Sequence, residues 1–495
     1  MKVISATDNS NVTGTFLVSA FSGDLEEQLT LTGLSAQEIK TISQNATALN
    51  FTATSGQTLN LFLAGNKAKS SKTIILFSLG ERDKLNRSAL YSAILAALNA
   101  GKGLKATDLV LTSLNLEGTS VNYSQLGEVI SEAAMQAEYS YTLKTELGGH
   151  KEPHRIHSLS VQNSQPEVKQ ALTQGDVIAY ALALAKRLSD TPANIMTPEQ
   201  LKDEAIAVAG RSGGRIEIKI LDKTALTSLG ANGILAVGSG SSHPCYMIEL
   251  SYTPPSGATK KKLAMVGKSV CFDAGGLCLK TATGMLGMQR DMTGGGIVLA
   301  VIEAIAKLGI PLSVNAYMAP VFNMLGDDAA KVGDVMQMLG GLTVENTNTD
   351  AEGRLTLADM VAWAQIRGCN TIVDIATLTG AAVQITGDAA ACIMGNDEAF
   401  TSLIVESGKA TDEALQPLIM FEKIRKYNRD GKIADLKNSV GSVGAGTIVA
   451  AWFIREFIKE IPWAHLDIAP VSKEGNFGVK TLIHLVKTLA EQASR

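Results

Sequence analysis

The sequence predicts an α/β protein built from two domains, and three observations support this expectation. The chain has 495 residues, more than a single hydrophobic core usually supports. Short β-branched and apolar runs alternate with helical patterns, which is typical of parallel βαβ units. A long helical pattern followed by turn residues separates two such stretches. We therefore expect domains at 1–165 and 196–495, joined by a connecting helix and linker at 166–195.

In the first domain, strand and helix patterns follow one another twice. The run TIILFSLG (73–80) is rich in β-branched residues, ends in glycine and predicts a strand. The run DLVLTSLNL (108–116) predicts another. Helical patterns cover 88–100 and about 126–137. This order predicts parallel strands joined by helices.

The second domain repeats the alternation. A helical pattern at 168–188 leads into it, and Thr197 followed by Pro198 and Glu199 is typical of a helix start. Further apolar runs predict strands at 215–221, 246–252, 262–268, 313–321, 371–378 and 464–469. In open α/β sheets, functional groups gather at the carboxyl ends of the strands, so we expect a site there.

Composition and charge argue against several classes of protein. Hydrophobic residues make up 45% of the chain and charged residues 19%, which is ordinary for a globular protein. The net charge of -4 gives no basic footprint for nucleic acid or an anionic membrane. The most apolar stretches, such as 296–310, are too short to span a membrane and carry charges. The five cysteines form no CxxC pair and the first residues lack a secretory apolar run, so we expect reduced thiols and a cytoplasmic protein.

Two segments concentrate acidic and basic residues. The first, VGKSVCFDAGGLCLKTATGMLGMQRDM (266–292), places Lys268, Asp273, Lys280 and Asp291 directly after a predicted strand.

The second segment, NTDAEGRL (348–355), carries Asp350, Glu352 and Arg354 at a spacing of two. We expect an extended segment in which all three side chains project to one side. A helix should follow, because apolar residues recur at helical spacing over 357–364.

Four carboxylates at one place repel one another and raise one another's pKa unless cations are present. Two divalent ions would balance the four negative charges, and the pKa of a water between them can fall to about 7, which makes it a nucleophile at neutral pH. Oxygen-rich ligands suit Zn, Mn, Mg or Co, so the sequence leaves the metal open. Any one of these residues taken alone is more often part of a surface ion pair.

Three other signals carry less weight. His150, His154 and His157 have no partner cysteine or carboxylate set, which favours a structural or solvated loop. VGKS (266–269) resembles the end of a nucleotide-binding loop, but lysine occupies position 262, where that motif needs glycine. His465 lies in an apolar run, where a satisfied core histidine is more common than a ligand.

The octapeptide NTDAEGRL (348–355) resembles the signature of the leucyl aminopeptidases, the M17 cytosol aminopeptidase family. Further matches are VGKSVCFDAGG (266–276) with Lys280, the GMxxMxxDM pattern (284–292) and DIATLTGA (374–381). The resemblance covers about residue 188 to the C-terminus, and the first 150 residues match only loosely. It implies a smaller, variable N-terminal α/β domain and a larger catalytic α/β domain with a mixed, mostly parallel sheet. It is also the chief reason to prefer a metal site over surface ion pairs.

By position, the resemblance implies the metal ligands Lys268, Asp273, Asp291, Asp350 and Glu352. Asp273 and Glu352 would bridge both ions, Asp350 would belong mainly to one, and Lys268 and Asp291 to the other. The implied catalytic pair is Lys280, which would stabilise the oxyanion, and Arg354, which would hold a bicarbonate ion as general base.

The implied reaction is hydrolysis of the first peptide bond of short peptides with a free N-terminal amine, by a homohexamer whose active sites face an internal cavity. The implied pocket for the first side chain is small or apolar, which suits leucine or methionine, and consists of Met288, Thr377, Gly380 and Ala469. The sequence departs from the family at Ala274, Leu286-Gly287, 326–335 and Ser472. None of these is an implied ligand, and they leave the fine side-chain preference open.

Two alternatives remain at this point. Some members of the family that the chain resembles also act as DNA-binding regulatory proteins, which would need a basic stripe on the N-terminal domain that the sequence does not contain. A catalytically inactive relative is disfavoured, because all seven site residues are present.

Overall fold

The computed structural model of the chain describes residues 1–6, 14–64, 71–163, 165–441 and 444–493. It divides into two compact units, Met1–Tyr180 and Ala181–Arg495. The division lies within the long helix α5 (Pro166–Asp190), which covers the helix predicted at 168–188. The assignment of 166–195 as a separate connector stays a prediction.

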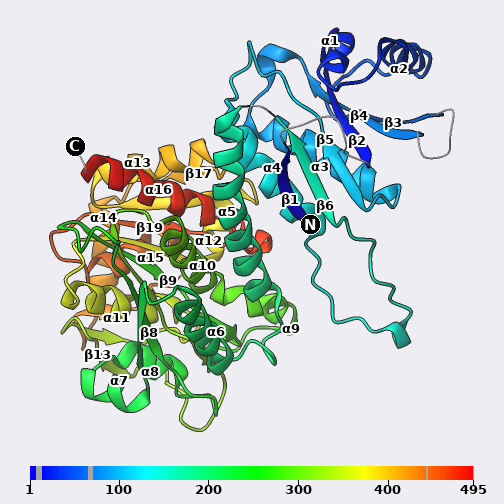
Figure 1. The fold of residues 1–495 in the computed structure, drawn as a ribbon. Coiled ribbons are helices and arrows are strands. Elements are labelled where there is room, and N and C mark those ends of the chain that lie inside the picture. Colours follow the sequence, from blue (N-terminus) through cyan, green and yellow to red (C-terminus); the bar gives the residue numbers. More distant parts are fainter. Residues whose placement is uncertain (7–13, 65–70, 164, 442–443, 494–495) are drawn as a thin grey trace. The chain divides into compact units, whose positions relative to one another are not determined.

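The N-terminal unit is a six-stranded sheet with helices on both faces (Figure 1). Neighbouring strands are parallel except for the edge pair β3–β4. In sheet order the strands are β1 (Lys2–Ala6), β6 (Ser158–Gln162), β5 (Asp108–Leu111), β2 (Thr15–Phe21), β4 (Lys72–Gly80) and β3 (Thr58–Leu63). The helical elements are α1 (Leu25–Thr30), α2 (Ala36–Ala48), η2 (Arg82–Lys84), α3 (Arg87–Gly103), α4 (Tyr123–Glu138) and η3 (Glu146–Gly148).

Residues of β4 alternate between two hydrophobic cores. Ile75 and Phe77 pack in the core that includes α3 and α4, while Ile74 and Leu76 pack in the core that includes α1 and α2. A strand covered on both faces reads as a continuous apolar run, which explains the pattern TIILFSLG. The strand predicted at 108–116 is shorter, because β5 ends at Leu111.

The second unit is built on an eight-stranded mixed sheet whose four central strands, β19, β15, β9 and β11, run parallel. In sheet order the strands are β17 (Leu415–Pro417), β16 (Ala391–Gly395), β19 (Trp463–Asp467), β15 (Thr371–Ala376), β9 (Lys262–Gly267), β11 (Ser313–Met318), β8 (Met247–Tyr252) and β7 (Ile216–Leu221). Two small sheets pair β10 (Val270–Asp273) with β12 (Val321–Asn323), and β14 (Thr343–Glu345) with β13 (Val335–Gln337) and β18 (Leu436–Lys437). The strand predicted at 313–321 is thus split into β11 and β12; Pro320 lies between them and has no N–H for a ladder bond.

Helices surround this sheet (Figure 1). They are α6 (Pro198–Arg211), α7 (Lys223–Leu229), α8 (Asn232–Gly238), α9 (Ala282–Met285), η4 (Met288–Met292), α10 (Thr293–Leu308), α11 (Gly353–Ile366), α12 (Gly380–Thr386), α13 (Glu398–Ala410), α14 (Glu422–Arg429), α15 (Gly446–Arg455), η5 (Ser472–Glu474) and α16 (Val479–Ala493). The prediction of an α/β fold with a mixed, mostly parallel catalytic sheet is confirmed.

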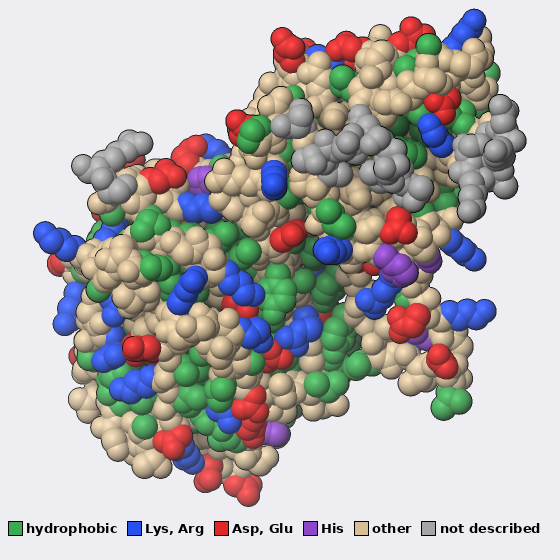
Figure 2. All heavy atoms as spheres, in the orientation of Figure 1, with side chains coloured by type: hydrophobic (Ala, Val, Ile, Leu, Met, Phe, Trp, Pro, Cys, Tyr) green, Lys and Arg blue, Asp and Glu red, His purple; other side chains and the backbone are tan. Residues whose placement is uncertain are grey.

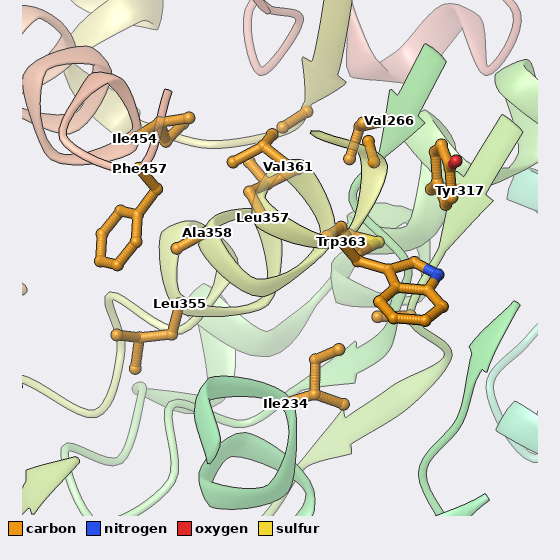
Figure 3. Packing of buried hydrophobic residues seen from close by; sticks show 14 of the residues in the cluster. Ile234, Val266, Tyr317, Leu355, Leu357, Ala358, Val361, Trp363, Ile454 and Phe457 are labelled. Atoms are coloured by element: carbon orange, nitrogen blue, oxygen red, sulfur yellow. The ribbon is translucent and has the colours of Figure 1, made fainter. Parts of the chain in front are cut away.

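The core of the second unit lies between the sheet and α11. Figure 3 shows Leu357 and Val361 of α11 among residues from β9, α8 and α15, and both are fully buried. Ala364 is buried as well, so the helical spacing predicted over 357–364 is confirmed. Anchoring α11 in this core also fixes its first turn, which immediately follows the acidic segment 350–352.

The face drawn in Figure 2 has no large patch of one charge, because Lys and Arg side chains are interspersed with Asp and Glu. Among the residues that the structure describes, no helix is long and apolar enough to cross a membrane.

The main chain of helix α10 packs directly against the main chain at the ends of strands β9 and β15. A Cβ atom added at Gly294 would lie 2.1 Å from the Ile375 carbonyl oxygen and 2.9 Å from the Lys268 nitrogen. Only glycine fits such a contact between a helix and two strand ends. This approach fixes Lys268, which follows β9, against the start of α10 and the neighbouring Asp291.

We predict that Gly294→Ala lowers the free energy of unfolding by about 1–3 kcal/mol, because the added methyl forces the backbone of α10 away from the sheet. The matched control is Gly210→Ala on α6, where no neighbouring atom lies within 4 Å of the added carbon. That change should stabilise the protein by about 0.4–1 kcal/mol. Urea unfolding followed by tryptophan fluorescence measures both, since all three tryptophans lie in the second unit. A Gly294→Ala protein as stable as wild type would contradict the packing described.

Candidate metal centre

The acidic and basic residues singled out in the sequence lie at the carboxyl ends of strands in the second unit. Lys268 directly follows β9, and Asp273 is the last residue of β10. Asp291 lies in η4, just before α10. Glu352 is the residue before the first turn of α11. Strands and helix ends that are distant in sequence therefore meet at one place.

Lys268 forms the centre of one group of charges. Its Nζ lies 2.8 Å from Asp291 Oδ1 and 2.8 Å from Glu352 Oε1, and it donates a hydrogen bond to the Thr377 carbonyl at 3.0 Å. A Cβ atom on Gly353 would lie 2.5 Å from the Lys268 Cε, so the glycine of NTDAEGRL makes room for this side chain.

Lys280 forms the centre of a second group. Its Nζ lies 2.8 Å from Asp273 Oδ2 and also pairs with Asp350. The two lysines differ in exposure: the side chain of Lys280 is 18% exposed and that of Lys268 is 3% exposed. One ammonium group is thus accessible from solvent and the other is enclosed.

The segment 348–352 is not extended, and the prediction that Asp350, Glu352 and Arg354 project to one side of a strand is wrong. Asn348 accepts a hydrogen bond from the Asp350 nitrogen at 2.9 Å, which closes a turn. Glu352 has helical backbone angles, and Arg354 already lies in α11. The turn directs Asp350 to Lys280 and Glu352 to Lys268, while Arg354 donates to the Asn438 carbonyl at 2.7 Å.

Burial dominates the electrostatics of the carboxylates. It raises the pKa of Asp273 to about 6, with a further rise from the Glu352 carboxylate. Burial also raises the pKa of Asp291 well above its ordinary value and raises that of Asp350. Glu352 is the exception, because burial is outweighed there by Lys268, and its pKa is lowered.

The lysines respond in the opposite way. Burial lowers the pKa of a lysine, but the carboxylates of Asp291, Glu352 and Asp273 outweigh it at Lys268, whose pKa is raised. At Lys280 burial is likewise outweighed by Asp273, and the pKa is raised. In the absence of metal ions both lysines are therefore ammonium ions that partly neutralise the acids.

The arrangement fits divalent cations. One oxygen each of Asp273, Asp350 and Glu352 lies within 4.8 Å of the others, a spacing that could hold a metal ion. Within the described part of the chain, the buried oxygens Asp291 Oδ2 and Glu352 Oε2 have no hydrogen-bond partner. Buried carboxylate oxygens without donors are costly, and hard cations are the partners that such oxygens accept.

Residues that the resemblance assigned to a substrate pocket lie on segments tied to the same place. Thr377 donates from Oγ1 to Asp291 Oδ1 at 2.8 Å, and Met288 begins η4, which carries Asp291. Gly380 begins α12. Ala469 donates its N–H to Asp467 at 3.2 Å, and Asp467 also accepts from Leu378 at 3.2 Å, so the two pocket segments are joined.

Sequence reasoning missed the amides that hold the acidic segments. Asn323, at the end of β12, donates to Asp273 Oδ1 at 2.8 Å and to the Thr349 carbonyl at 3.0 Å. Asn438, directly after β18, donates in the same way to Asn346 Oδ1 at 3.0 Å and to the Asn348 carbonyl at 2.7 Å. Buried side-chain amides leave no periodic signal in a sequence. The one available signal is their position at the end of, or directly after, strands that lie next to the acidic segments.

The histidines set aside in the sequence lie elsewhere. His465 is fully buried in β19, as expected for a core histidine, but it is only half satisfied: Nδ1 pairs with Asp374, and Nε2 has no partner among the described residues. His154 pairs with the Ala106 carbonyl at 2.8 Å in the N-terminal unit. Among the described residues, the group of side chains spaced to hold a metal ion is Asp273, Asp350 and Glu352, and it contains no histidine.

Two family models match the chain. The model of the catalytic domain of the cytosol aminopeptidase family matches residues 183–485, and the model of the N-terminal domain of that family matches residues 17–146. A probable cytosol aminopeptidase of Nitrosococcus oceani is 35% identical over 424 residues, covering 85% of this chain and 83% of that protein. One of Alkaliphilus oremlandii is 32% identical over 454 residues, covering 89% of each. The resemblance read from the motifs is confirmed.

Solved structures resemble the whole fold. The bottromycin maturation enzyme BotP has a TM-score of 0.81 at 29% sequence identity, covering 96% of this chain and 99% of that chain. The structure of BotP in complex with Mn has a TM-score of 0.82 at the same identity and coverage.

We predict that divalent ions compete with protons for this site. If Lys268 is a ligand it must bind as the neutral amine, so its raised pKa means that loading at pH 7 releases at least one proton, with any proton held by Asp291 in addition. Asp273, with a pKa of about 6, is increasingly protonated as the pH falls to 5, so the apparent affinity for Mn²⁺ should rise from pH 5 to pH 8. Calorimetric titration of chelator-treated protein in buffers of different ionisation enthalpy counts the protons. Tight binding without proton release would argue that Lys268 is not a ligand.

Proposed function

The chain belongs to the cytosol aminopeptidase family, and from this premise we propose that it is a two-metal exopeptidase that removes leucine and other apolar residues from the N-terminus of short peptides. The family is metal-dependent and hydrolyses N-terminal peptide bonds. The finer assignments that follow are the ligands, the roles of the two lysines and Arg354, and the side-chain preference.

The main support for the proposal is the group of four carboxylates around two lysines, of which Asp273, Asp291 and Glu352 are buried and Asp350 is partly exposed. The proposed ligands are Lys268, Asp273, Asp291, Asp350 and Glu352. When bound, two divalent ions supply Lewis-acid polarisation of the substrate carbonyl and a water of lowered pKa as nucleophile. Zn and Mn are the first candidates, with Mg and Co as alternatives, and the Mn complex of BotP makes Mn²⁺ the natural first choice for a test.

The difference in exposure supports different roles for the two lysines. Lys268, enclosed by Asp291, Glu352 and the Thr377 carbonyl, has the surroundings of a ligand. Lys280 is partly exposed and its pKa is raised, so it stays cationic where a substrate can reach it. An ammonium group in that place stabilises the negative charge that develops on the carbonyl oxygen during attack.

Arg354 is proposed to hold a bicarbonate ion that acts as general base. Burial lowers its pKa to about 10, which still leaves the guanidinium charged at neutral pH. Its Nη1 is used by the Asn438 carbonyl, and in the described chain its Nε has no partner. A partly buried cation with a free donor suits a small anion.

The proposed pocket for the first side chain is formed by Met288, Thr377, Gly380 and Ala469. Small and apolar linings suit leucine and methionine. Leu286, 80% exposed, lies just before Met288 and would be free to contact the substrate at the pocket rim. The proposed setting is a cytoplasmic homohexamer that admits short peptides, as the family resemblance implies. The DNA-binding alternative gains no support from the mixed charges in Figure 2.

We predict that leucine amide is hydrolysed only when divalent ions are present and only with a free amine. Treatment with o-phenanthroline should abolish the activity, and Mn²⁺, Zn²⁺ or Co²⁺ should restore it, because four carboxylates cannot otherwise hold a nucleophilic water. N-acetyl-leucine amide should be cleaved more slowly by orders of magnitude, because an acylated amine is a poor ligand. Product release followed by chromatography measures both. Full activity of verified metal-free protein, or equal rates for the two amides, would refute the proposal.

We predict opposite defects for the two lysines. Lys268→Ala should weaken metal binding, seen as a reduced metal content per chain by elemental analysis. Lys280→Ala should keep both ions and lose about a hundredfold or more in kcat, as when a comparable oxyanion donor is removed. Each variant is the control of the other, since both remove a lysine from the same site. If Lys280→Ala loses metal and Lys268→Ala does not, the two roles have been assigned in reverse.

A further inference from the structure

Asn438 connects two parts of the proposed site, the acidic turn before α11 and the side chain of Arg354. It directly follows β18, which pairs in parallel with β14, the strand that leads into the acidic turn. Its side chain is completely buried. A buried amide needs partners for two donors and one acceptor, so the bonds that it makes are obligatory rather than incidental.

The side chain of Asn438 bonds to three successive residues, 346–348, which lead into the turn that carries Asp350. Its Nδ2 donates to Asn346 Oδ1 at 3.0 Å and to the Asn348 carbonyl at 2.7 Å. Its Oδ1 accepts from the Thr347 nitrogen at 2.8 Å and the Thr347 hydroxyl at 3.1 Å. From this turn Asp350 reaches Lys280 and Glu352 reaches Lys268, so its backbone conformation sets the separation of their carboxylates.

The main chain of Asn438 holds the arginine. Its carbonyl oxygen accepts the Arg354 Nη1–H at 2.7 Å. The guanidinium of Arg354 in α11 and the turn that carries Asp350 are therefore both bonded to one residue, which lies in a separate segment directly after β18.

We propose that Asn438 is a positioning residue that sets the carboxylates of the acidic turn relative to Arg354. It touches neither the substrate nor the reacting atoms and acts only through residues that do. The inference rests on the proposed function for its catalytic consequence, but its effect on the metal ligands is independent of what the enzyme cleaves.

The test compares Asn438→Ala with Asn315→Ala as a matched control. Asn315 is also a buried asparagine, with its Nδ2 bonded to Glu249 at 3.1 Å and the Tyr317 hydroxyl at 2.9 Å, and it bonds to none of the site residues. Both variants lose a buried amide, so both should lose thermal stability. Asn438→Ala alone should lower the affinity for Mn²⁺ about 10–100-fold, the usual cost of losing a residue that orients ligands. It should also lower kcat with little change in KM, since no substrate contact is removed.

Thr347→Val provides a milder test that keeps the side-chain volume. It removes the hydroxyl that donates to Asn438 Oδ1 and to the Ser439 carbonyl at 2.7 Å, and should weaken Mn²⁺ binding in the same direction by a smaller factor. It keeps the proposal testable if Asn438→Ala does not fold. Calorimetric titration with Mn²⁺ measures the affinity of the site for the ion and does not depend on peptide hydrolysis.

Wild-type protein that binds two ions but cleaves no peptide would refute the proposed function and leave this test intact. Wild-type Mn²⁺ affinity in folded Asn438→Ala, or in Thr347→Val where the alanine variant does not fold, would overturn the positioning role.

Discussion

The fold of the second unit is constrained above all by the need to keep buried carboxylates of like charge together. Asp273, Asp291, Asp350 and Glu352 repel one another, and burial raises the pKa of three of them. Two lysines neutralise part of this charge, and each bridges acids that come from distant segments. Such a cluster persists only because the surrounding structure fixes the backbone on which each acid lies. The apolar core around α11 and the close contact of Gly294 with the sheet supply that rigidity.

The acids are held by polar groups of the main chain and by side-chain amides rather than by packing alone. Thr377 orients Asp291, Asn323 orients Asp273, and the turn before α11 is closed by Asn348. The Thr377 bond leaves the second oxygen of Asp291, Oδ2, without a partner among the described residues, whereas the second oxygen of Asp273 faces Lys280. A buried carboxylate with one hydrogen-bonded oxygen and one unpartnered oxygen is suited to a cation. The unpartnered oxygen gains a partner only when the ion binds.

The sequence predicted the architecture and the chemistry better than the local geometry. Alternating strand and helix patterns gave the α/β fold, because β4 and the central strands are buried on both faces and read as apolar runs. The spacing of Asp350, Glu352 and Arg354 was misread as a strand, because a period of two is also compatible with a turn that enters a helix. The amides Asn323 and Asn438 could not be found in this way. Their role depends on which loops the sheet brings together, a long-range property that one sequence does not display.

The balance of charge at the site decides which partners it can hold. Without metal ions, the charges of Lys268, Lys280 and Arg354 are opposed by four carboxylates, so the site has no uncompensated positive charge to hold an anion. Two divalent ions would cancel the carboxylates, and Lys268 would lose its proton to become a ligand. Lys280 and Arg354, both partly buried, would then be uncompensated positive charges. A bicarbonate ion and the developing oxyanion are the groups that such a field favours. Loading with metal would therefore turn a site without spare positive charge into one that needs an anion, which links the proposed ligands to the proposed catalytic pair.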